Sequence, residues 1–231
     1  MKNVIAINGS PNKEKGYTGL ILAAFLDGMR SAGSDADVIY TSDLDLKPCA
    51  GEMYCWYKHP GACYIKDDMQ EVYQQLRQAD VLIIATPVYI PLPGKMQVFI
   101  NRLCPLLHPL LKTREDRTRA QFRDGVKIKK FMLVSTGGWW EKENFNSVIR
   151  IVEELALNSG VEFSGALIRP HAFLMMKEKT LTDQGKKVIE LVNESGREYA
   201  LKESLDPKKL EMISEPLVSR AALIERYNKL L

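Results

Sequence analysis

The sequence predicts an α/β fold built on a doubly wound parallel sheet with helices on both faces. Short β-branched runs alternate with longer amphipathic stretches along most of the 231 residues. Two of the runs, Val4–Ile7 and Val81–Ala85, contain no polar alternation, which is typical of central strands buried on both sides. Parallel strands need crossover connections, and these pack as helices on the faces of the sheet.

The order of the elements follows from these runs. Strands are expected at Val4–Ile7, Asp37–Tyr40, Val81–Thr86, Phe131–Ser135 and Glu162–Ile168. Helices are expected at Thr18–Met29, Asp68–Gln78, Met96–Leu103, Phe145–Asn158 and Thr182–Ala200. Residues 1–205 would form one domain. Residues 206–231 would form a helical extension, with Pro216 opening a helix that packs on this domain or on a second subunit.

Composition excludes several classes of protein. The 32 basic residues exceed the 29 acidic ones by only three, too few to indicate nucleic-acid binding. No apolar run reaches the roughly 20 residues that cross a bilayer, and the first run is shorter than the apolar part of a signal peptide. Four cysteines without an export signal are typical of the reducing cytoplasm, where we expect this protein.

Three unusual loops follow the first, third and fourth predicted strands. In sheets of this type ligands bind outside the carboxyl ends of the strands. The first loop, residues 9–19, holds three glycines and the hydroxyls of Ser10, Tyr17 and Thr18, and leads directly into a helix. Converging amides and a helix N-terminus favour a phosphate, although a plain strand-to-helix turn is the alternative. The loop matches neither the nucleotide-triphosphate nor the dinucleotide glycine pattern.

The other two loops suit a flat aromatic ring. Residues 86–95 contain three prolines and a glycine, which stiffen the chain and present its backbone groups in fixed directions. Residues 135–140 combine the glycine pair Gly137 and Gly138 with Trp139 and Trp140. Tryptophans at a glycine-rich strand end favour a stacking wall, and burial in the core remains the alternative for one of them.

Taken together, these segments resemble the flavodoxin-like NAD(P)H-dependent FMN reductases, in the branch that includes the iron–sulfur flavoproteins. The resemblance rests on the loop Gly9–Thr18, on Pro87–Met96 leading into Phe99–Leu103, and on Gly138–Phe145, which occur in the right order. It implies a five-stranded sheet of order 2-1-3-4-5, bound FMN, NAD(P)H as electron donor, and a homodimer or larger homo-oligomer.

The resemblance also implies where FMN would lie. The phosphate would contact Ser10, Lys13, Tyr17 and Thr18. One edge of the isoalloxazine would contact Pro87, Val88 and Tyr89, and the other flank would contact Thr136, Gly137, Gly138 and Trp139. The first loop departs from the family pattern, because four residues rather than three separate Pro11 from Gly16 and because Tyr17 replaces an asparagine.

Residues 49–69 resemble the cysteine motif of the iron–sulfur flavoproteins. The motif supplies four thiolates, which a [4Fe–4S] cluster requires, but here Glu52 stands where the second cysteine would be, leaving Cys49, Cys55 and Cys63. A carboxylate is a poor ligand for cluster iron. Zinc held by these cysteines and His59 is the alternative. We expect a structured loop without metal, and Cys104 as a small buried hydrophobe.

Residues 108–130 form a basic insertion between the third crossover helix and the fourth strand. Eight basic residues outnumber three acidic ones between Lys112 and Lys130, a local balance of +5. A long loop there would attract the phosphates of NAD(P)H, wrap a partner subunit, or be a solvated charged loop.

The expected function is that of an FMN-dependent oxidoreductase. It would take hydride from NAD(P)H and pass electrons to a small acceptor such as a quinone, a flavin or a nitroaromatic compound, with the flavin carrying the chemistry and no side chain acting as acid or base. Tyr89 and Trp139 would shape the open face. The alternatives are a flavodoxin-like electron carrier, for which this chain lacks an acidic surface, and a flavin-free regulatory relative.

Overall fold

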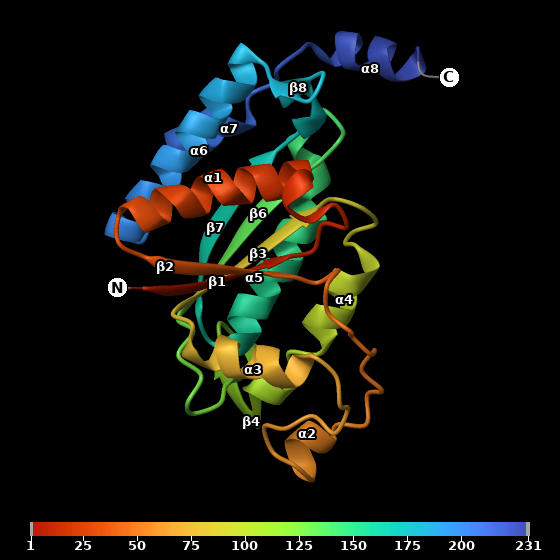
Figure 1. Ribbon diagram of the computed structural model, residues 1–231. Helices are drawn as coiled ribbons and strands as arrows, with labels where there is room; N and C mark the ends of the chain where they lie inside the picture. The colour runs from red at the N-terminus through yellow and green to blue at the C-terminus, as the bar shows by residue number, and fades with distance from the viewer. Residues whose placement is uncertain (1, 230–231) are drawn as a thin grey trace.

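A computed structural model describes residues 2–229 and places five parallel strands at its centre (Figure 1). The sheet contains, in spatial order, β2 (Asp35–Tyr40), β1 (Asn3–Asn8), β3 (Val81–Pro87), β6 (Lys130–Thr136) and β7 (Glu162–Arg169). Counting only these five strands, the order is 2-1-3-4-5, so the predicted flavodoxin-like topology is confirmed. β1 and β3 are almost wholly buried, as their unbroken apolar runs predicted.

Two layers of helices cover the sheet (Figure 1). The long helices are α1 (Tyr17–Ser31), α3 (Met69–Gln78), α4 (Gly94–Asn101), α5 (Asn146–Ser159) and α6 (Asp183–Lys202). α1 and α6 pack together on one face. Gly28 permits their close approach, because a Cβ at that position would lie 1.9 Å from the carbonyl oxygen of Asn193. α3, α4 and α5 cover the other face and enclose a separate apolar core.

The basic insertion is not a loop. Residues 107–122 form an antiparallel hairpin of β4 (Leu107–Arg114) and β5 (Arg117–Phe122). Its arginines bind the rest of the chain: Arg114 donates to the Leu157 carbonyl at 2.8 Å, and Arg119 pairs with Glu154 on α5 at 2.5 Å. The prediction of a loop was wrong for residues 107–122, where arginines attach the hairpin to α5, whereas residues 123–129 form no helix or strand.

The C-terminal segment also differs from expectation. Two helices occur there, α7 (Pro207–Ser214) and α8 (Arg220–Asn228). Pro207 opens α7 after an Asp206 cap, whereas Pro216 lies in the connection and Ser219 caps α8, so the prediction that Pro216 opens a helix was wrong. The sequence also places Leu217, Ala221, Ile224 and Leu231 at helical spacing after Pro216, and of these Leu231 lies outside the described residues.

Smaller elements complete the chain. They are η1 (Lys13–Lys15), α2 (Tyr54–Tyr57), η2 (Cys104–Leu106), η3 (Lys142–Phe145), η4 (Ala172–Met175), β8 (Met176–Lys177) and β9 (Thr180–Leu181). No helix within residues 2–229 has both the length and the apolar composition needed to span a bilayer. The division into a domain of residues 1–205 and an extension stays a prediction.

A buried ion pair fixes the cysteine segment to the domain. Arg102 and Asp67 have side chains that are 1% and 0% exposed, and the guanidinium donates two hydrogen bonds, of 2.5 and 3.0 Å, to the carboxylate. Arg102 also donates to the Lys47 carbonyl and contacts the Cys63 sulfur at 3.5 Å. The Arg102 guanidinium therefore binds the chain before and after the cysteines of this segment, at Lys47 and at Asp67, and connects it to the end of α4.

We expect Asp67→Asn to lower the free energy of unfolding by about 3–5 kcal/mol, because it leaves a buried guanidinium without its counter-charge. Urea unfolding measures this change. Asp27→Asn is the matched control, since Asp27 pairs with Arg30 on the exposed face of α1, and its effect should stay below about 1 kcal/mol. Equal losses in the two variants would contradict a special role for the buried pair.

Candidate flavin site

Three loops meet at the carboxyl edge of the sheet and form a cleft. Nine of the eleven predicted site residues line this cleft: Ser10, Tyr17, Thr18, Pro87, Val88, Tyr89, Thr136, Gly137 and Gly138. Asn12, Gly16, Ala172 and Phe173 complete its walls. The loop after β7, which contributes Ala172 and Phe173, was not predicted, because its residues carry no glycine or hydroxyl pattern.

The first turn of α1 supplies free backbone donors to the cleft. The first bond within α1 runs from the Leu20 N–H to the Gly16 carbonyl at 3.0 Å, and no side chain caps the helix. Within residues 2–229, the N–H groups of Tyr17, Thr18 and Gly19 therefore have no partner. Uncapped N–H groups and the helix dipole together favour an anion, so this turn fits a phosphate.

The phosphate loop is held in place by its own contacts. The Asn8 side chain accepts the Ser10 N–H at 2.8 Å, and the Thr18 and Thr136 hydroxyls are hydrogen-bonded at 2.6 Å. The latter bond joins the first loop to the end of β6. A Cβ on Gly19 would lie 2.2 Å from the Lys13 carbonyl, so only glycine lets η1 fold against α1. Contacts within the protein therefore define the shape of this loop.

Lys13 is not among the residues that line the cleft. Its ammonium group pairs with Asp43, beyond the end of β2, and hydrogen bonding to that carboxylate raises the pKa of Lys13. The donors that face the cleft are thus amides and hydroxyls. A phosphate contact by Lys13 requires this ion pair to open.

A second, apolar cleft of about 860 Å³ adjoins the first and falls within the usual size range of ligand sites. The two clefts share Val88, Tyr89, Gly137 and Gly138, and the second adds Trp139 and Phe145. Trp139 is 68% exposed and Tyr89 is 52% exposed, so both rings are available for stacking. Trp140, by contrast, is half-buried and donates its ring N–H to the Val218 carbonyl.

Backbone groups around the apolar cleft are unequally available. The N–H groups of Val88 and Tyr89 donate to the carbonyls of Thr136 and Pro91, so they are not free to contact a ligand. The N–H groups of Gly138 and Trp139 have no partner within the described part of the chain. The backbone N–H groups left without a partner at this cleft therefore belong to the loop after β6 and not to Val88 or Tyr89 of the proline-rich loop.

The cysteine segment does not present the donor set of an iron–sulfur cluster. Cys49 is exposed, Cys63 contacts Arg102, and burial together with the nearby Cys104 raises the pKa of Cys55 to about 12. Cys104, which was expected to be buried, is half-buried at the start of η2. Across residues 2–229, no three metal-binding side chains stand close enough together to hold an ion.

Comparison with known proteins identifies the family. A sequence model of the family described as NADPH-dependent FMN reductase matches residues 2–142, more than half of the chain. The chain belongs to this family. An iron–sulfur flavoprotein of Methanocaldococcus jannaschii is 34% identical over 104 residues, which are 45% of this chain and 52% of that protein. The chain thus spans about half the length of this curated relative.

Solved structures of low sequence identity share the fold. An NAD(P)H:quinone oxidoreductase from Methanothermobacter marburgensis has a TM-score of 0.62 and 16% identity, covering 85% of this chain and 96% of that one. An FMN-dependent NADH-azoreductase from Bacillus anthracis, in complex with FMN, has a TM-score of 0.56 and 12% identity, covering 88% of this chain and all of that one. These likenesses confirm the flavodoxin-like architecture.

Behind the cleft, a buried histidine supports the loop that follows β7. His171 is 0% exposed, and its Nε2 accepts hydrogen bonds from Arg169 and from the Leu217 N–H, both at 3.0 Å. Because Nε2 accepts both bonds, the ring is neutral. Burial, with the nearby Arg169 charge, lowers the pKa of His171 to about 4.

This histidine predicts a pH dependence of stability. Between about pH 6.5 and 4 the unfolded chain binds a proton at His171 that the folded chain does not, so the free energy of unfolding falls as pH decreases. The loss from this group approaches roughly 3 kcal/mol at pH 4. Urea unfolding of wild type and His171→Gln across this range measures it. Parallel curves for the two proteins would contradict the prediction.

Proposed function

We propose that this protein is an FMN-dependent oxidoreductase that takes hydride from NAD(P)H and reduces a small acceptor such as a quinone, a flavin or a nitroaromatic compound. The observation that carries the proposal is the joining of two unlike clefts. One ends on the uncapped N-terminus of α1, and the other is apolar and bordered by two exposed aromatic rings. A molecule with a phosphate tail and a flat ring fits both clefts at once.

In this proposal the phosphate binds to the first turn of α1. The N–H groups of Tyr17, Thr18 and Gly19 would donate to it, with the Ser10 and Thr18 hydroxyls beside them. Hydrogen bonds from several fixed amides to an anion are charge-assisted and therefore stronger than bonds between neutral groups. Lys13 would add to them only by leaving Asp43.

The ring would lie between the proline-rich loop and the loop after β6. Pro87, Val88 and Tyr89 would contact one edge, and the free amides of Gly138 and Trp139 would contact the other. When bound, FMN supplies the two-electron chemistry, and the protein holds the ring and leaves one face open to donor and acceptor. The mainly apolar cleft favours flat, uncharged acceptors.

The visible spectrum of the purified protein tests this proposal directly. We expect the protein to bind added FMN, and NADH or NADPH to bleach the flavin absorbance, with recovery when a quinone is added. Bleaching only when a redox protein is present would favour the electron carrier instead. A protein that takes up no FMN would overturn the assignment.

Ser10→Ala tests the phosphate end of the site. Loss of one charge-assisted hydrogen bond should raise the dissociation constant for FMN by roughly tenfold or more, with little change for riboflavin, which lacks the phosphate. Quenching of flavin fluorescence measures both constants. Ser34→Ala, in the turn after α1 and away from the cleft, is the matched control and should bind as wild type does. An equal rise in the dissociation constant for riboflavin would contradict a contact between Ser10 and the phosphate.

A further inference from the structure

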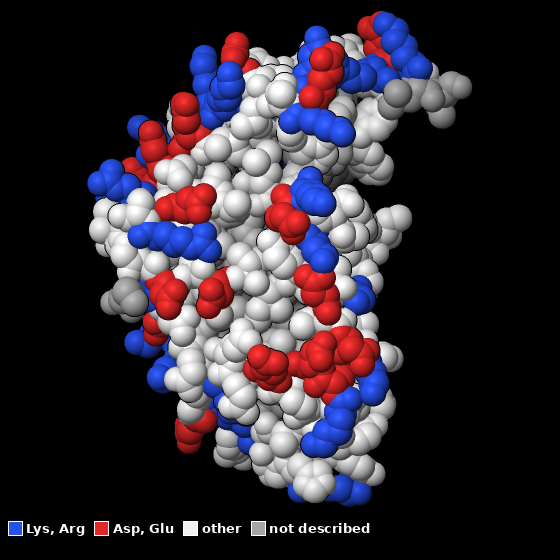
Figure 2. All heavy atoms as spheres, in the orientation of Figure 1, with Lys and Arg blue, Asp and Glu red and all other residues white. Residues whose placement is uncertain are grey.

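The C-terminal arm, residues 215–229 with α8, lies outside the residues matched by the family model and borders the candidate site. α8 projects beyond the sheet and its helical layers (Figure 1), and an indentation lies beneath it in the space-filling view (Figure 2). Within α8 only Leu223 is buried. A helix that buries so little apolar surface contributes little to the core, so packing alone does not account for its position.

One group of contacts joins the arm to the loop after β6. The Trp140 ring N–H donates to the Val218 carbonyl at 2.9 Å. Arg220 lies over the Trp140 ring, 4.8 Å from its centre, and pairs with Glu141 at 3.0 Å. Trp140 and Glu141 directly follow Trp139, so the arm holds the outer half of the loop that carries the free amides.

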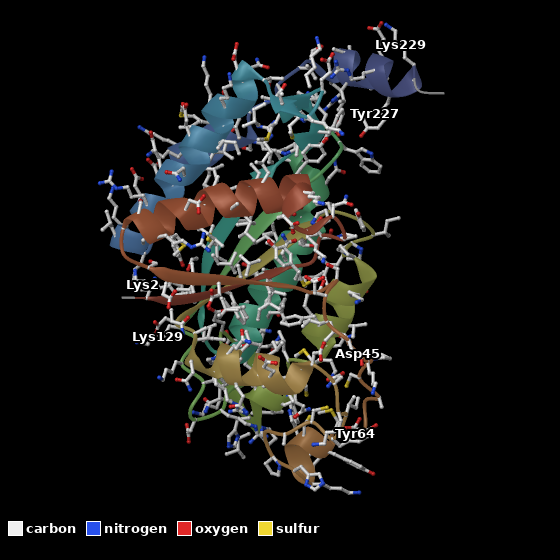
Figure 3. The ribbon with its side chains drawn as sticks, in the orientation of Figure 1. Lys2, Asp45, Tyr64, Lys129, Tyr227 and Lys229 are labelled. Atoms are coloured by element: carbon white, nitrogen blue, oxygen red, sulfur yellow. The ribbon has the colours of Figure 1, made fainter. Side chains whose placement is uncertain are left out.

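Tyr227 makes a second group of contacts, at the cleft itself. Its side chain extends from α8 (Figure 3), its hydroxyl donates to the Gly138 carbonyl at 3.4 Å, and its ring packs edge-on against Phe173 with centres 5.7 Å apart. A Cβ on Gly138 would lie 3.0 Å from the Tyr227 oxygen. Tyr227 therefore covers the side of Gly138 that a larger residue would occupy.

The base of the arm is fixed to the domain by buried groups. Leu217 donates its N–H to His171, and the fully buried Arg169 donates to the Ile213 carbonyl just before the arm. The bond from Arg169 is buried and the bond from Leu217 is part-buried, and a lost hydrogen bond is costly where solvent cannot replace it. The arm therefore has a defined position from which α8 can act on the loop.

We propose that Tyr227 is a positioning residue for the flavin site. Together with Arg220 it holds the loop at Gly138 and Trp139 so that the two free amides face the ring. The inference rests on the proposed function, and it assigns a part of the site to the C-terminal arm, which lies outside the residues 2–142 that the family model matches.

The first test removes α8 by ending the chain after Ser219. We expect the dissociation constant for FMN to rise about tenfold, because the loop is no longer held in its binding conformation. The midpoint of urea unfolding should change little, since Leu223 is the one buried side chain among the described residues that the truncation removes. Hydrogen exchange of the His171 and Ala172 amides, which donate to the Trp139 and Gly137 carbonyls of this loop, should become faster when measured without flavin.

The second test combines variants of Gly138 and Tyr227. A general loss of stability would not produce the rescue of FMN binding that is expected from the combined variant. Gly138→Ala should weaken FMN binding severalfold, because the added Cβ meets the Tyr227 oxygen and displaces the loop. Tyr227→Phe removes that oxygen and, in the Gly138→Ala background, should restore most of the affinity. Tyr57→Phe, at an exposed tyrosine on α2, is the matched control and should have no effect.

The outcomes separate the two proposals. If wild type binds FMN and the truncated and Tyr227 variants bind it equally well with unchanged hydrogen exchange, the role of the arm is wrong and the function stands. Additive effects of Gly138→Ala and Tyr227→Phe on the free energy of FMN binding would also contradict the proposed role of Tyr227. If wild type binds no FMN, the proposed function fails and the inference fails with it.

Discussion

The polarity of the parallel sheet determines where every candidate functional group lies. Because β1, β3, β6 and β7 run in the same direction, the chain leaves each of them at one edge, and residues as far apart as Ser10 and Phe173 line a single cleft. The hydrogen bond between Thr18 and Thr136 joins two of these exits directly. The site is therefore a consequence of topology, and local loop chemistry decides what it can bind.

Much of this arrangement could be predicted from the sequence, because its signals are local. Buried parallel strands are continuous apolar runs, and glycines and hydroxyls before a helix mark an anion-binding turn, as at Gly16 and Thr18. The predicted strands agree with the observed ones to within two residues at each end. The grouping of nine predicted site residues in one cleft follows from the same reasoning, whereas their binding roles stay predictions.

The failures concern partners that are distant in sequence. Nothing near Lys13 indicates that Asp43 holds its ammonium group, and nothing near Arg119 indicates Glu154 on a helix 35 residues away. The hairpin was missed because its basic residues look like a solvated loop until their partners are known. Likewise, the part played by Phe173 and Tyr227 depends on how the C-terminal arm packs, which short-range patterns do not encode.

The hairpin of β4 and β5 has a consequence for how the molecule meets its surroundings. Arg114, Arg119 and Arg123 direct their guanidinium groups onto α5 and α2, so these three of the eight basic residues in the stretch are engaged by the rest of the chain. In Figure 2 blue and red groups both occur over the visible face, with one cluster of red groups toward its lower right. A polyanion that approaches this stretch therefore meets fewer free guanidinium groups than the sequence alone suggests.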